Sequence, residues 1–326
     1  MSTQKIYDTI IKKEPIQKGW SGDTKYCVTV YDGTKYLMRA MPVGKLEAWQ
    51  NLFAMLERVA ALGVPMSKPV ELGTCEDGLY ALLSWIDGED LAAVLPKLKE
   101  AEQYELGVKA GEILRLIHSA PAPENLETWC KLGAKADGAS SVMHSVPQLE
   151  DLKNWSTAYI RKTDDKIKKY KNGEIINFRG GKHFMRYIEQ NRESLGALLE
   201  NRPQCFRHGD YFIHNMMLEN GELRIIDFDR LSYGDPWEDF FKVAFYTQIC
   251  PPFATGQVRG YFDGEPPEDF FKLTAFYISS RLLESITLAA QYGGRKAVKF
   301  NKKLCADVLK WHDNMNNPVP SWYLKG

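Results

Sequence analysis

The chain has 326 residues, which is enough for two packed units of ordinary domain size. Hydrophobic residues make up 44% and charged residues 26%, and 42 basic residues balance 42 acidic ones, so the formal net charge is zero. This composition can form a sizeable core and lacks the overall basic charge of a general nucleic-acid binder. We therefore expect no nucleic-acid partner.

The chain carries no run of 18 apolar residues, so we expect no membrane span. The first residues, 1–5, lack the apolar run of a signal peptide. The six cysteines are scattered without a C-x-x-C motif or histidines at metal spacing, which favours reduced thiols in a cytoplasmic protein over disulfides or zinc. The sequence does not decide between a monomer and a dimer.

Residues 6–40 are expected to form β-structure. Strands are predicted over 26–31 and 34–40, and Asp32-Gly33 between them is a strong hairpin signal. A glycine-containing turn, residues 19–23, precedes the hairpin.

The next residues, 44–62, carry apolar side chains at helical spacing and end at Gly63, which predicts a helix. Two further strands are predicted over 69–73 and 79–85. We place a boundary at the turn that follows, so that an N-terminal lobe spans 1–88.

The remaining residues, 89–326, read as a mainly helical lobe. Its predicted helices span 101–118, 147–170, 183–199, 236–248, 267–291 and 301–316. A short β-rich segment, 205–229, interrupts them. A β-rich lobe followed by a mostly helical lobe indicates an α+β protein.

The β-rich segment carries two aspartates and an asparagine at a characteristic spacing. His208-Gly209-Asp210 is followed by Asn215, five residues after the aspartate. A predicted hairpin then leads to Asp227, which follows an apolar pair. Phosphoryl transfer needs one carboxylate to orient a hydroxyl, and it needs oxygen ligands that hold magnesium against phosphate. This spacing matches the kinase catalytic-loop pattern, with glycine in place of the usual arginine.

These motifs resemble the aminoglycoside phosphotransferase family and its choline-kinase-like relatives. The resemblance covers nearly the whole chain and includes the hinge-like stretch 84–89 and the stretch 234–239. It implies a bilobal protein-kinase-like fold, with a five-stranded antiparallel sheet and one helix in the first lobe. It also implies a catalytic or hydroxyl-orienting role for Asp210, magnesium binding by Asn215 and Asp227, and a bracing role for His208.

The nucleotide side follows the kinase pattern less closely. Arg39 occupies the place of the phosphate-binding strand lysine of kinases. Its guanidinium group can still contact phosphate through paired hydrogen bonds. Glu47 is its predicted partner, although an acid near a helix start also stabilises the helix dipole. The other expected nucleotide contacts are made by the glycine turn and the hinge: Gly19, Ser21, Gly22, Ser84 and Ile86. Nothing separates ATP from GTP as the donor.

The stretch 227–269 holds nine acidic and three basic residues, which would attract a cationic acceptor. Helix capping explains these acids equally well. The proposed acceptor contacts are Asp229, Glu238, Asp239 and Glu268. Asp229 is as well explained as a structural partner.

Three functions remain open from the sequence. The first is a kinase of an aminoglycoside-like antibiotic, which would confer resistance. The second is a metabolic kinase of an amine alcohol or a sugar, since the fold does not settle the substrate. The third is a nucleotide-binding protein without physiological transfer. The presence of Asp210, Asn215 and Asp227 counts against the third function.

Overall fold

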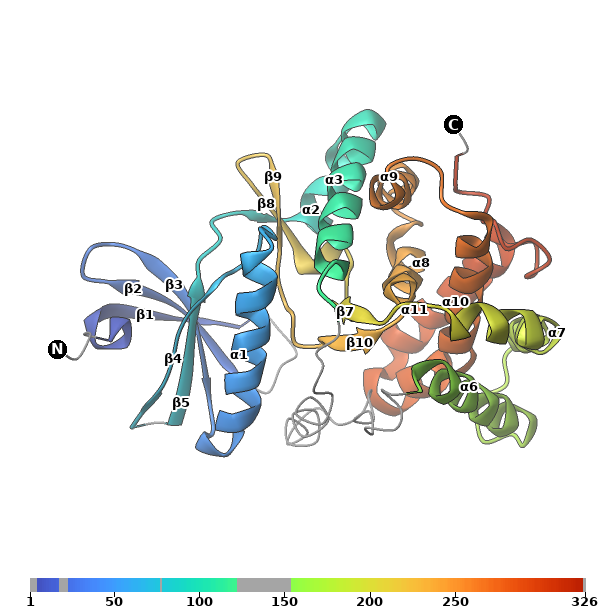
Figure 1. Cartoon of the computed structure of the whole chain (residues 1–326), viewed down its shortest axis with the longest axis horizontal. Helices are drawn as coiled ribbons and strands as arrows, with labels where there is room; N and C mark the ends of the chain where they lie inside the picture. The colour runs from blue at the N-terminus through green and yellow to red at the C-terminus, as the bar shows by residue number, and fades with distance from the viewer. Residues whose placement is uncertain (1–4, 18–22, 77, 122–153, 325–326) are drawn as a thin grey trace. The chain divides into compact units, whose positions relative to one another are not determined.

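The computed structural model describes residues 5–17, 23–76, 78–121 and 154–324 (Figure 1). The chain divides into two compact units. The described residues of the first unit lie between 5 and 89, together with Met217–Ile226. The second, mainly helical unit takes the other described residues.

The first unit contains a five-stranded antiparallel sheet in the order β1-β2-β3-β5-β4. Its strands are β1 (Ile10–Ile16), β2 (Thr24–Val30), β3 (Lys35–Met41), β4 (Pro69–Cys75) and β5 (Gly78–Ser84). A single longer helix, α1 (Leu46–Ala61), crosses between β3 and β4, and the short 3-10 helices η1 (Ile6–Thr9) and η2 (Val43–Lys45) flank these elements. The predicted sheet, hairpin and helix are confirmed.

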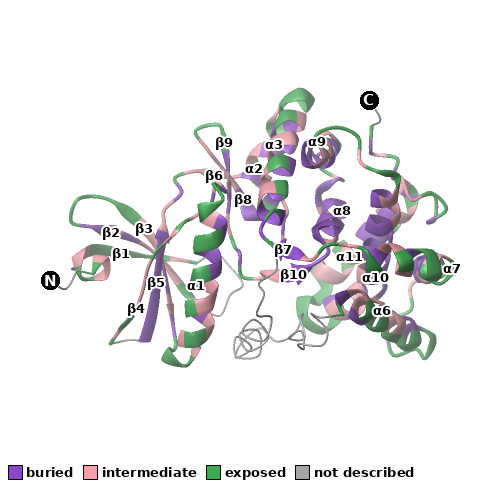
Figure 2. Ribbon diagram, viewed as in Figure 1, coloured by how far each residue is buried: buried purple, intermediate pink, exposed green. Residues whose placement is uncertain are grey.

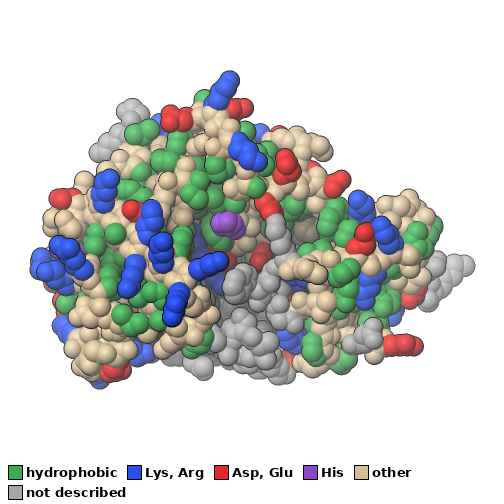
Figure 3. Space-filling view, turned by 180° about the vertical axis from the view of Figure 1, so that it is seen from behind, with side chains coloured by type: hydrophobic (Ala, Val, Ile, Leu, Met, Phe, Trp, Pro, Cys, Tyr) green, Lys and Arg blue, Asp and Glu red, His purple; other side chains and the backbone are tan. Residues whose placement is uncertain are grey.

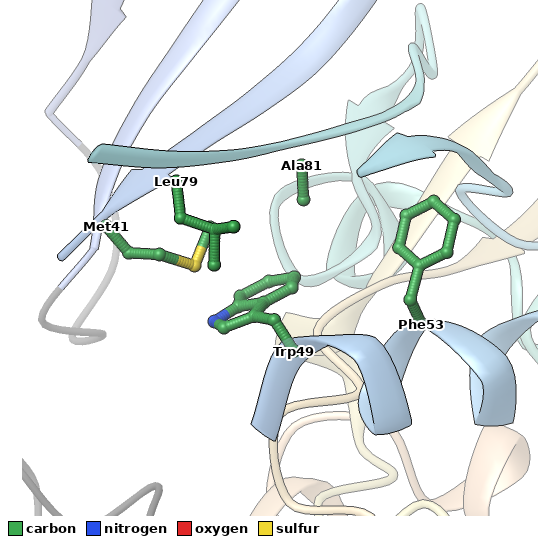
Figure 4. Close-up of a cluster of buried hydrophobic side chains, with 5 residues drawn as sticks. All are labelled: Met41, Trp49, Phe53, Leu79 and Ala81. Carbon is green, nitrogen blue, oxygen red and sulfur yellow. The ribbon is translucent and has the colours of Figure 1, made fainter. Parts of the chain in front are cut away.

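The two faces of β5 carry different clusters because successive strand residues point to opposite sides. Leu79 and Ala81 face α1, where they pack with Met41 and with Trp49 and Phe53 of the helix (Figure 4). On the other face a second cluster forms from Val28, Met38, Tyr80 and Leu82. The strand is therefore buried on both faces from Gly78 to Leu83.

The second unit is built from helices and short strands. Its longer helices are α3 (Glu100–His118), α6 (Trp155–Lys171), α7 (Gly181–Glu200), α9 (Pro251–Phe262), α10 (Glu268–Leu288) and α11 (Gly294–Trp311). Shorter helical segments are α2 (Leu91–Val94), η3 (Leu95–Lys97), η4 (Ile213–Asn215), η5 (Pro236–Lys242), α8 (Val243–Tyr246) and the π-helix η6 (Ala289–Gly293). Figure 2 shows that buried residues concentrate on the inner faces of α3, α8 and α10.

Four short strands complete the second half of the chain. β7 (Cys205–Arg207) pairs antiparallel with β10 (Ser232–Gly234) inside the second unit. β8 (Met216–Glu219) and β9 (Glu222–Ile225) form the predicted hairpin, and they share a sheet with the two-residue strand β6 (Glu89–Asp90). The α+β architecture expected from the sequence is confirmed.

Helix α9 is not among the predicted helices, because it begins with two prolines and contains two glycines. Proline is tolerated in the first helical turn, where its missing N–H has no partner to lose. The glycines serve packing: a Cβ atom at Gly256 or Gly260 would lie 2.2 or 2.0 Å from a carbonyl oxygen of α3. Gly107 and Gly111 of α3 make the reciprocal approach to the α9 backbone. The two helices therefore pack at backbone contact distance.

The predicted helix over 236–248 takes a tighter form. Residues Pro236–Lys242 form a 3-10 helix, and only Val243–Tyr246 continue as an α-helix. Asp235 caps this segment by accepting a hydrogen bond from the backbone N–H of Trp237.

Among the described residues, none of the helices combines the length and hydropathy needed to cross a membrane.

The glycine contact between α3 and α9 predicts a large stability effect. In Gly111→Ala, the new Cβ would lie 2.2 Å from the carbonyl oxygen of Gln257, so the helices must separate. We expect the free energy of unfolding to fall by about 2–4 kcal/mol in urea titrations. The matched control is Gly196→Ala in α7, where a Cβ meets only a methyl group of Ile160 at 3.9 Å. It should raise stability by roughly 0.5–1 kcal/mol, and equal effects of the two substitutions would contradict the packing.

Candidate active site

The loop that carries Asp210 begins where β7 ends, and we call residues 207–215 the Asp210 loop. Gly209 has a φ of 75°, and a Cβ atom there would lie 2.1 Å from the carbonyl oxygen of Arg230. Only glycine fits this backbone. The glycine that replaces arginine in the kinase-like motif is therefore required by the close approach of residue 230.

A buried carboxylate holds the start of this loop. Asp239 accepts hydrogen bonds from the backbone N–H groups of His208 and Gly209, each at 2.9 Å. Its Oδ2 also lies 3.1 Å from Nε2 of His118. Burial raises the pKa of Asp239, but hydrogen bonding and charge interaction with His118 outweigh burial and lower it. Asp239 therefore stays ionised and fixes the loop backbone.

His208 continues the brace to the key acid. Its ring is fully buried, and Nδ1 accepts a hydrogen bond from the backbone N–H of Asp210 at 3.2 Å. The ring packs 4.5 Å from that of Phe228, centroid to centroid. These contacts agree with the bracing role expected for this histidine.

The carboxylate of Asp210 lies between two basic side chains. Lys242, at the end of η5, forms an ion pair with Oδ1, and Nη1 of Arg230 lies 3.6 Å from Oδ2. Burial raises the pKa of Asp210, but Lys242 and Arg230 outweigh burial and hold it below its usual value. Asp210 is therefore a carboxylate at neutral pH.

Asn215 and Asp227 offer the two oxygen ligands expected for magnesium. Nδ2 of Asn215 donates to the carbonyl oxygen of Asp210 at 2.9 Å, so the side-chain oxygen is the atom left to coordinate a cation. Asp227 is exposed and has a φ of 63°, a left-handed backbone that aspartate tolerates at some cost. Carboxylate and amide oxygens suit magnesium, which completes its shell with phosphate and water. The residues therefore fit the ion.

The described side chains do not form a metal site on their own. In the described ranges, no three His, Cys, Asp or Glu side chains gather closely enough to hold a metal ion. Magnesium bound by Asn215 and Asp227 would take its remaining ligands from phosphate or water.

Arg39, which is expected to contact the nucleotide phosphates, is 6% exposed, and its neighbours include Asp23 and Trp49. Nη2 of Arg39 lies 2.5 Å from Oδ2 of Asp23, and its guanidinium carbon lies 4.6 Å from the ring centroid of Trp49. Glu47 is exposed in the first turn of α1, and its pairing with Arg39 stays a prediction. Sequence reasoning did not identify Asp23 as a partner.

Three other expected nucleotide contacts, Gly19, Ser21 and Gly22, lie outside the described residues. Ser84 is described, and its backbone N–H donates to the carbonyl oxygen of Lys68 at 2.8 Å. Its own carbonyl oxygen accepts from the hydroxyl of Ser67 at 2.6 Å. Both backbone groups of Ser84 are thus engaged by residues just before β4, and Ile86 is buried, so the two expected hinge contacts stay predictions.

The acidic stretch 227–269 is mostly neutralised by internal pairs. Glu238 pairs with Arg207, and Glu268 is highly exposed and pairs with Lys272 at 2.9 Å. Asp239 is the loop brace described above, so its contacts support a structural role instead of the acceptor contact expected from sequence. The fourth expected acceptor contact, Asp229, is exposed, and both interpretations of it remain.

Other acids of the stretch are also bonded. Asp235 is fully buried. Its carboxylate accepts hydrogen bonds from Nε and Nη2 of Arg202, each at 3.0 Å, and from the hydroxyl of Tyr277 at 2.5 Å. Glu265 pairs with Arg259. Figure 3 shows basic side chains on one face of the helical unit. Most of the acids counted in the stretch 227–269 are therefore engaged by internal partners.

Sequence reasoning missed Lys242 as a site residue. The signal was its position inside the apolar run Phe240 to Ala244, because a lysine flanked by apolar residues is buried and needs a carboxylate partner. That partner, Asp210, is 32 residues earlier in the chain. Local pattern alone could not have identified it.

Comparison with known proteins gives consistent results. A family model described as a phosphotransferase enzyme family matches residues 13–271. No curated protein matches the chain.

Among solved structures, the apo form of a thermostable aminoglycoside phosphotransferase APH(4)-Ia is similar, with 16% identity, a TM-score of 0.56 and coverage of 93% of this chain and 96% of that one. A gentamicin complex of APH(2")-IIa has 15% identity, a TM-score of 0.54 and coverage of 94% and 97%. A GDP complex of an aminoglycoside 2'-phosphotransferase-IIIa variant has 14% identity, a TM-score of 0.60 and coverage of 95% and 94%. These structures confirm the kinase-like fold.

The brace at Asp239 predicts a specific loss of stability. In Asp239→Asn, one backbone N–H of the loop would face an amide NH2 group instead of an oxygen, and the interaction with His118 would weaken. We expect the free energy of unfolding to fall by about 2–4 kcal/mol in urea titrations. The control Glu268→Gln removes an exposed pair and should change it by less than about 0.5 kcal/mol. A neutral effect of Asp239→Asn would show that the loop does not depend on this carboxylate.

Proposed function

The chain belongs to the phosphotransferase enzyme family, and we propose that it transfers the γ-phosphoryl group of a magnesium-bound nucleotide to a hydroxyl group of a small molecule. The observation that carries this proposal is the Asp210 loop, in which a buried aspartate and histidine fix an ionised carboxylate next to Asn215. Phosphoryl transfer depends mainly on such positioning.

In the proposed reaction Asp210 orients the acceptor hydroxyl and accepts its proton. A bond forms between the acceptor oxygen and the γ-phosphorus, the bond from that phosphorus to the bridging oxygen breaks, and the nucleoside diphosphate leaves. The low pKa of Asp210 suits this role, because the proton is transferred late in a loose transition state and the carboxylate acts chiefly by orientation.

When bound, magnesium neutralises the phosphates of the donor nucleotide. We assign its protein ligands to the amide oxygen of Asn215 and the carboxylate of Asp227. Arg39 is proposed to contact the phosphates, and its pair with Asp23 and contact with Trp49 support this by fixing the guanidinium. The backbone near Ile86 is proposed to bind the base, and both ATP and GTP remain open as donors.

The acceptor is the least determined part of the reaction. Structures with similar folds hold gentamicin in one case and hygromycin B in another. Fold likeness therefore favours the antibiotic-type cationic acceptor expected from the sequence, with a metabolic amine alcohol or sugar as the alternative. The internal pairing of Glu238, Asp239 and Glu268 removes much of the sequence argument for a cation. A nucleotide donor and five unpaired thiols in the described residues agree with a cytoplasmic enzyme.

Replacement of Asp210 tests the proposed transfer directly. In Asp210→Ala, we expect kcat to fall by about a thousandfold or more, because the carboxylate acts on the reacting hydroxyl. Nucleotide affinity, measured by calorimetry, should stay within about threefold. His214→Ala is the control, since His214 is exposed in the same loop and takes no part in the proposed reaction. Unchanged turnover in Asp210→Ala would remove the central assignment, and nucleotide binding without any Asp210-dependent transfer would favour the non-enzymatic function.

Replacement of Asp227 tests the metal assignment. Asp227→Asn is preferred to alanine because asparagine tolerates the left-handed backbone at this position. We expect nucleotide affinity to fall about tenfold or more with magnesium and to stay unchanged in EDTA. Asp263→Asn, at another left-handed aspartate that ends α9, is the matched control. Equal weakening with and without magnesium would show that Asp227 has a structural role.

A further inference from the structure

Lys242, at the C-terminal end of η5, is a buried lysine with one carboxylate partner. Its side chain is 10% exposed, and its ammonium group forms an ion pair with Oδ1 of Asp210. The described residues provide no other carboxylate within ion-pair distance of this lysine. Taking an ammonium group out of water is costly unless it is paired, so the burial of Lys242 depends on Asp210.

Three aromatic rings fix the position of this ammonium group. Its Nζ lies 4.7 Å from the ring centroid of Phe212, 5.3 Å from that of Phe241 and 5.1 Å from that of Phe245. Phe212 belongs to the Asp210 loop, and the other two rings belong to η5 and the following helix α8. Cations over aromatic faces are attracted most strongly where water is excluded. The ammonium group is therefore held in place before any ligand binds.

The short helix η5 supports the Asp210 loop at two points. Asp239 and Lys242 are three residues apart in this 3-10 helix, which has three residues per turn, so both side chains lie on the same side of it. Asp239 accepts hydrogen bonds from the backbone at the start of the loop, and Lys242 pairs with the side chain of Asp210. One element thus contacts both the backbone of the loop and its reactive group.

The two carboxylate oxygens of Asp210 have different surroundings. Oδ1, which faces Lys242, is closed off from solvent. Oδ2 is not closed off, makes no hydrogen bond within the described residues, and lies 3.6 Å from Nη1 of the partly exposed Arg230. Oδ2 is therefore the oxygen that an acceptor hydroxyl can reach.

Different groups fix the backbone and the side chain of Asp210. Its backbone N–H donates to Nδ1 of His208, and its carbonyl oxygen accepts from Nδ2 of Asn215. Neither contact limits rotation of the carboxylate about the side-chain bonds. The ion pair with Lys242 is the closer of the two ion pairs that this carboxylate makes within the described residues, so it determines which oxygen is turned inward.

We infer that Lys242 is a positioning residue for phosphoryl transfer: by binding Oδ1, it turns Oδ2 of Asp210 toward the acceptor hydroxyl. This inference rests on the proposed function, because it takes Asp210 as the residue that meets this hydroxyl. The hydroxyl donates a hydrogen bond to Oδ2, and its proton passes to Oδ2 as the acceptor oxygen bonds to the γ-phosphorus. Lys242 touches neither substrate and acts through Asp210.

Two competing roles for Lys242 can be separated from this one. A purely structural ion pair would affect folding and leave turnover unchanged. A lysine that bound the γ-phosphate of the donor would act whether or not Asp210 was present. A positioning residue loses its effect on turnover when Asp210 is absent, so a double-mutant cycle distinguishes the three roles.

We would measure magnesium-dependent turnover of ATP by the full chain with water as the acceptor probe. In Lys242→Met, an uncharged side chain of similar length packs against the same rings. We expect kcat to fall by about tenfold to a hundredfold, because a small misplacement of a reacting group costs this much, and the KM for ATP to stay within about threefold. In the Asp210→Ala background, the same substitution should change kcat by less than about twofold.

Matched variants assign the effect to the ion pair. Lys242→Arg should recover part of the loss, because a guanidinium group can also bind Oδ1. The control is Lys166→Met, since Lys166 of α6 is 22% exposed with its Nζ 3.9 Å from Glu284, and it should leave kcat and KM unchanged. If Lys242→Met fails to fold, Lys242→Gln decides, because its shorter, neutral side chain should also lower kcat without changing the KM for ATP.

A crystal structure of Lys242→Met gives a readout that does not depend on turnover. We expect the backbone of residues 208–210 to stay in place, because its hydrogen bonds to Asp239 and His208 are retained. The Asp210 carboxylate should turn so that Oδ1 leaves its closed-off position. In a crystal structure of Lys242→Arg, the carboxylate should keep its orientation.

Three results would overturn the inference. An Asp210 carboxylate that keeps its orientation in Lys242→Met, or an unchanged kcat, would leave Lys242 a structural role. Losses of kcat that add in the double variant, or a raised KM for ATP, would assign the lysine to the donor. Failure of the proposed function is distinguishable, because turnover would then be absent or independent of Asp210 while the carboxylate still turned in Lys242→Met.

Discussion

The arrangement of the candidate active site depends on one buried carboxylate. Asp239 is placed by the 3-10 helix that follows Asp235, and it accepts the two backbone N–H groups at the start of the Asp210 loop. A buried charge of this kind is stabilising only when it is fully hydrogen-bonded, and His118 supplies the third contact. The loop backbone is therefore fixed before any ligand binds, as phosphoryl transfer requires.

Most of the fold could be predicted from the sequence, because its signals are local. The Asp32-Gly33 hairpin, the apolar period of α1 and the β5 strand each follow from a few neighbouring residues. Helix α9 could not be predicted, since its glycines disfavour a helix locally and are explained only by the backbone of α3, more than 140 residues earlier. Packing against α3 therefore determines that this segment is a helix.

The candidate site likewise has residues that could be predicted from the sequence and features that could not. Asp210, Asn215 and Asp227 were found from spacing, and the structure adds geometry that fits their proposed roles. The charge around Asp210 could not be read from composition, because Glu238 and Asp239 are bound by internal partners and Lys242, from a distant segment, pairs with Asp210. A net count of acids measures charge along the chain, whereas a ligand meets only the charge left after pairing.

The most direct test of the account follows the phosphoryl group itself. The purified chain would be incubated with ATP or GTP, with magnesium or EDTA, and with anionic, neutral and cationic hydroxylated acceptors, and products would be identified by phosphorus NMR. The account predicts a new phosphate ester and equal release of nucleoside diphosphate, only with magnesium and an acceptor. Nucleotide binding without a phosphate ester on any acceptor would contradict the claim that this chain transfers phosphoryl groups to small molecules.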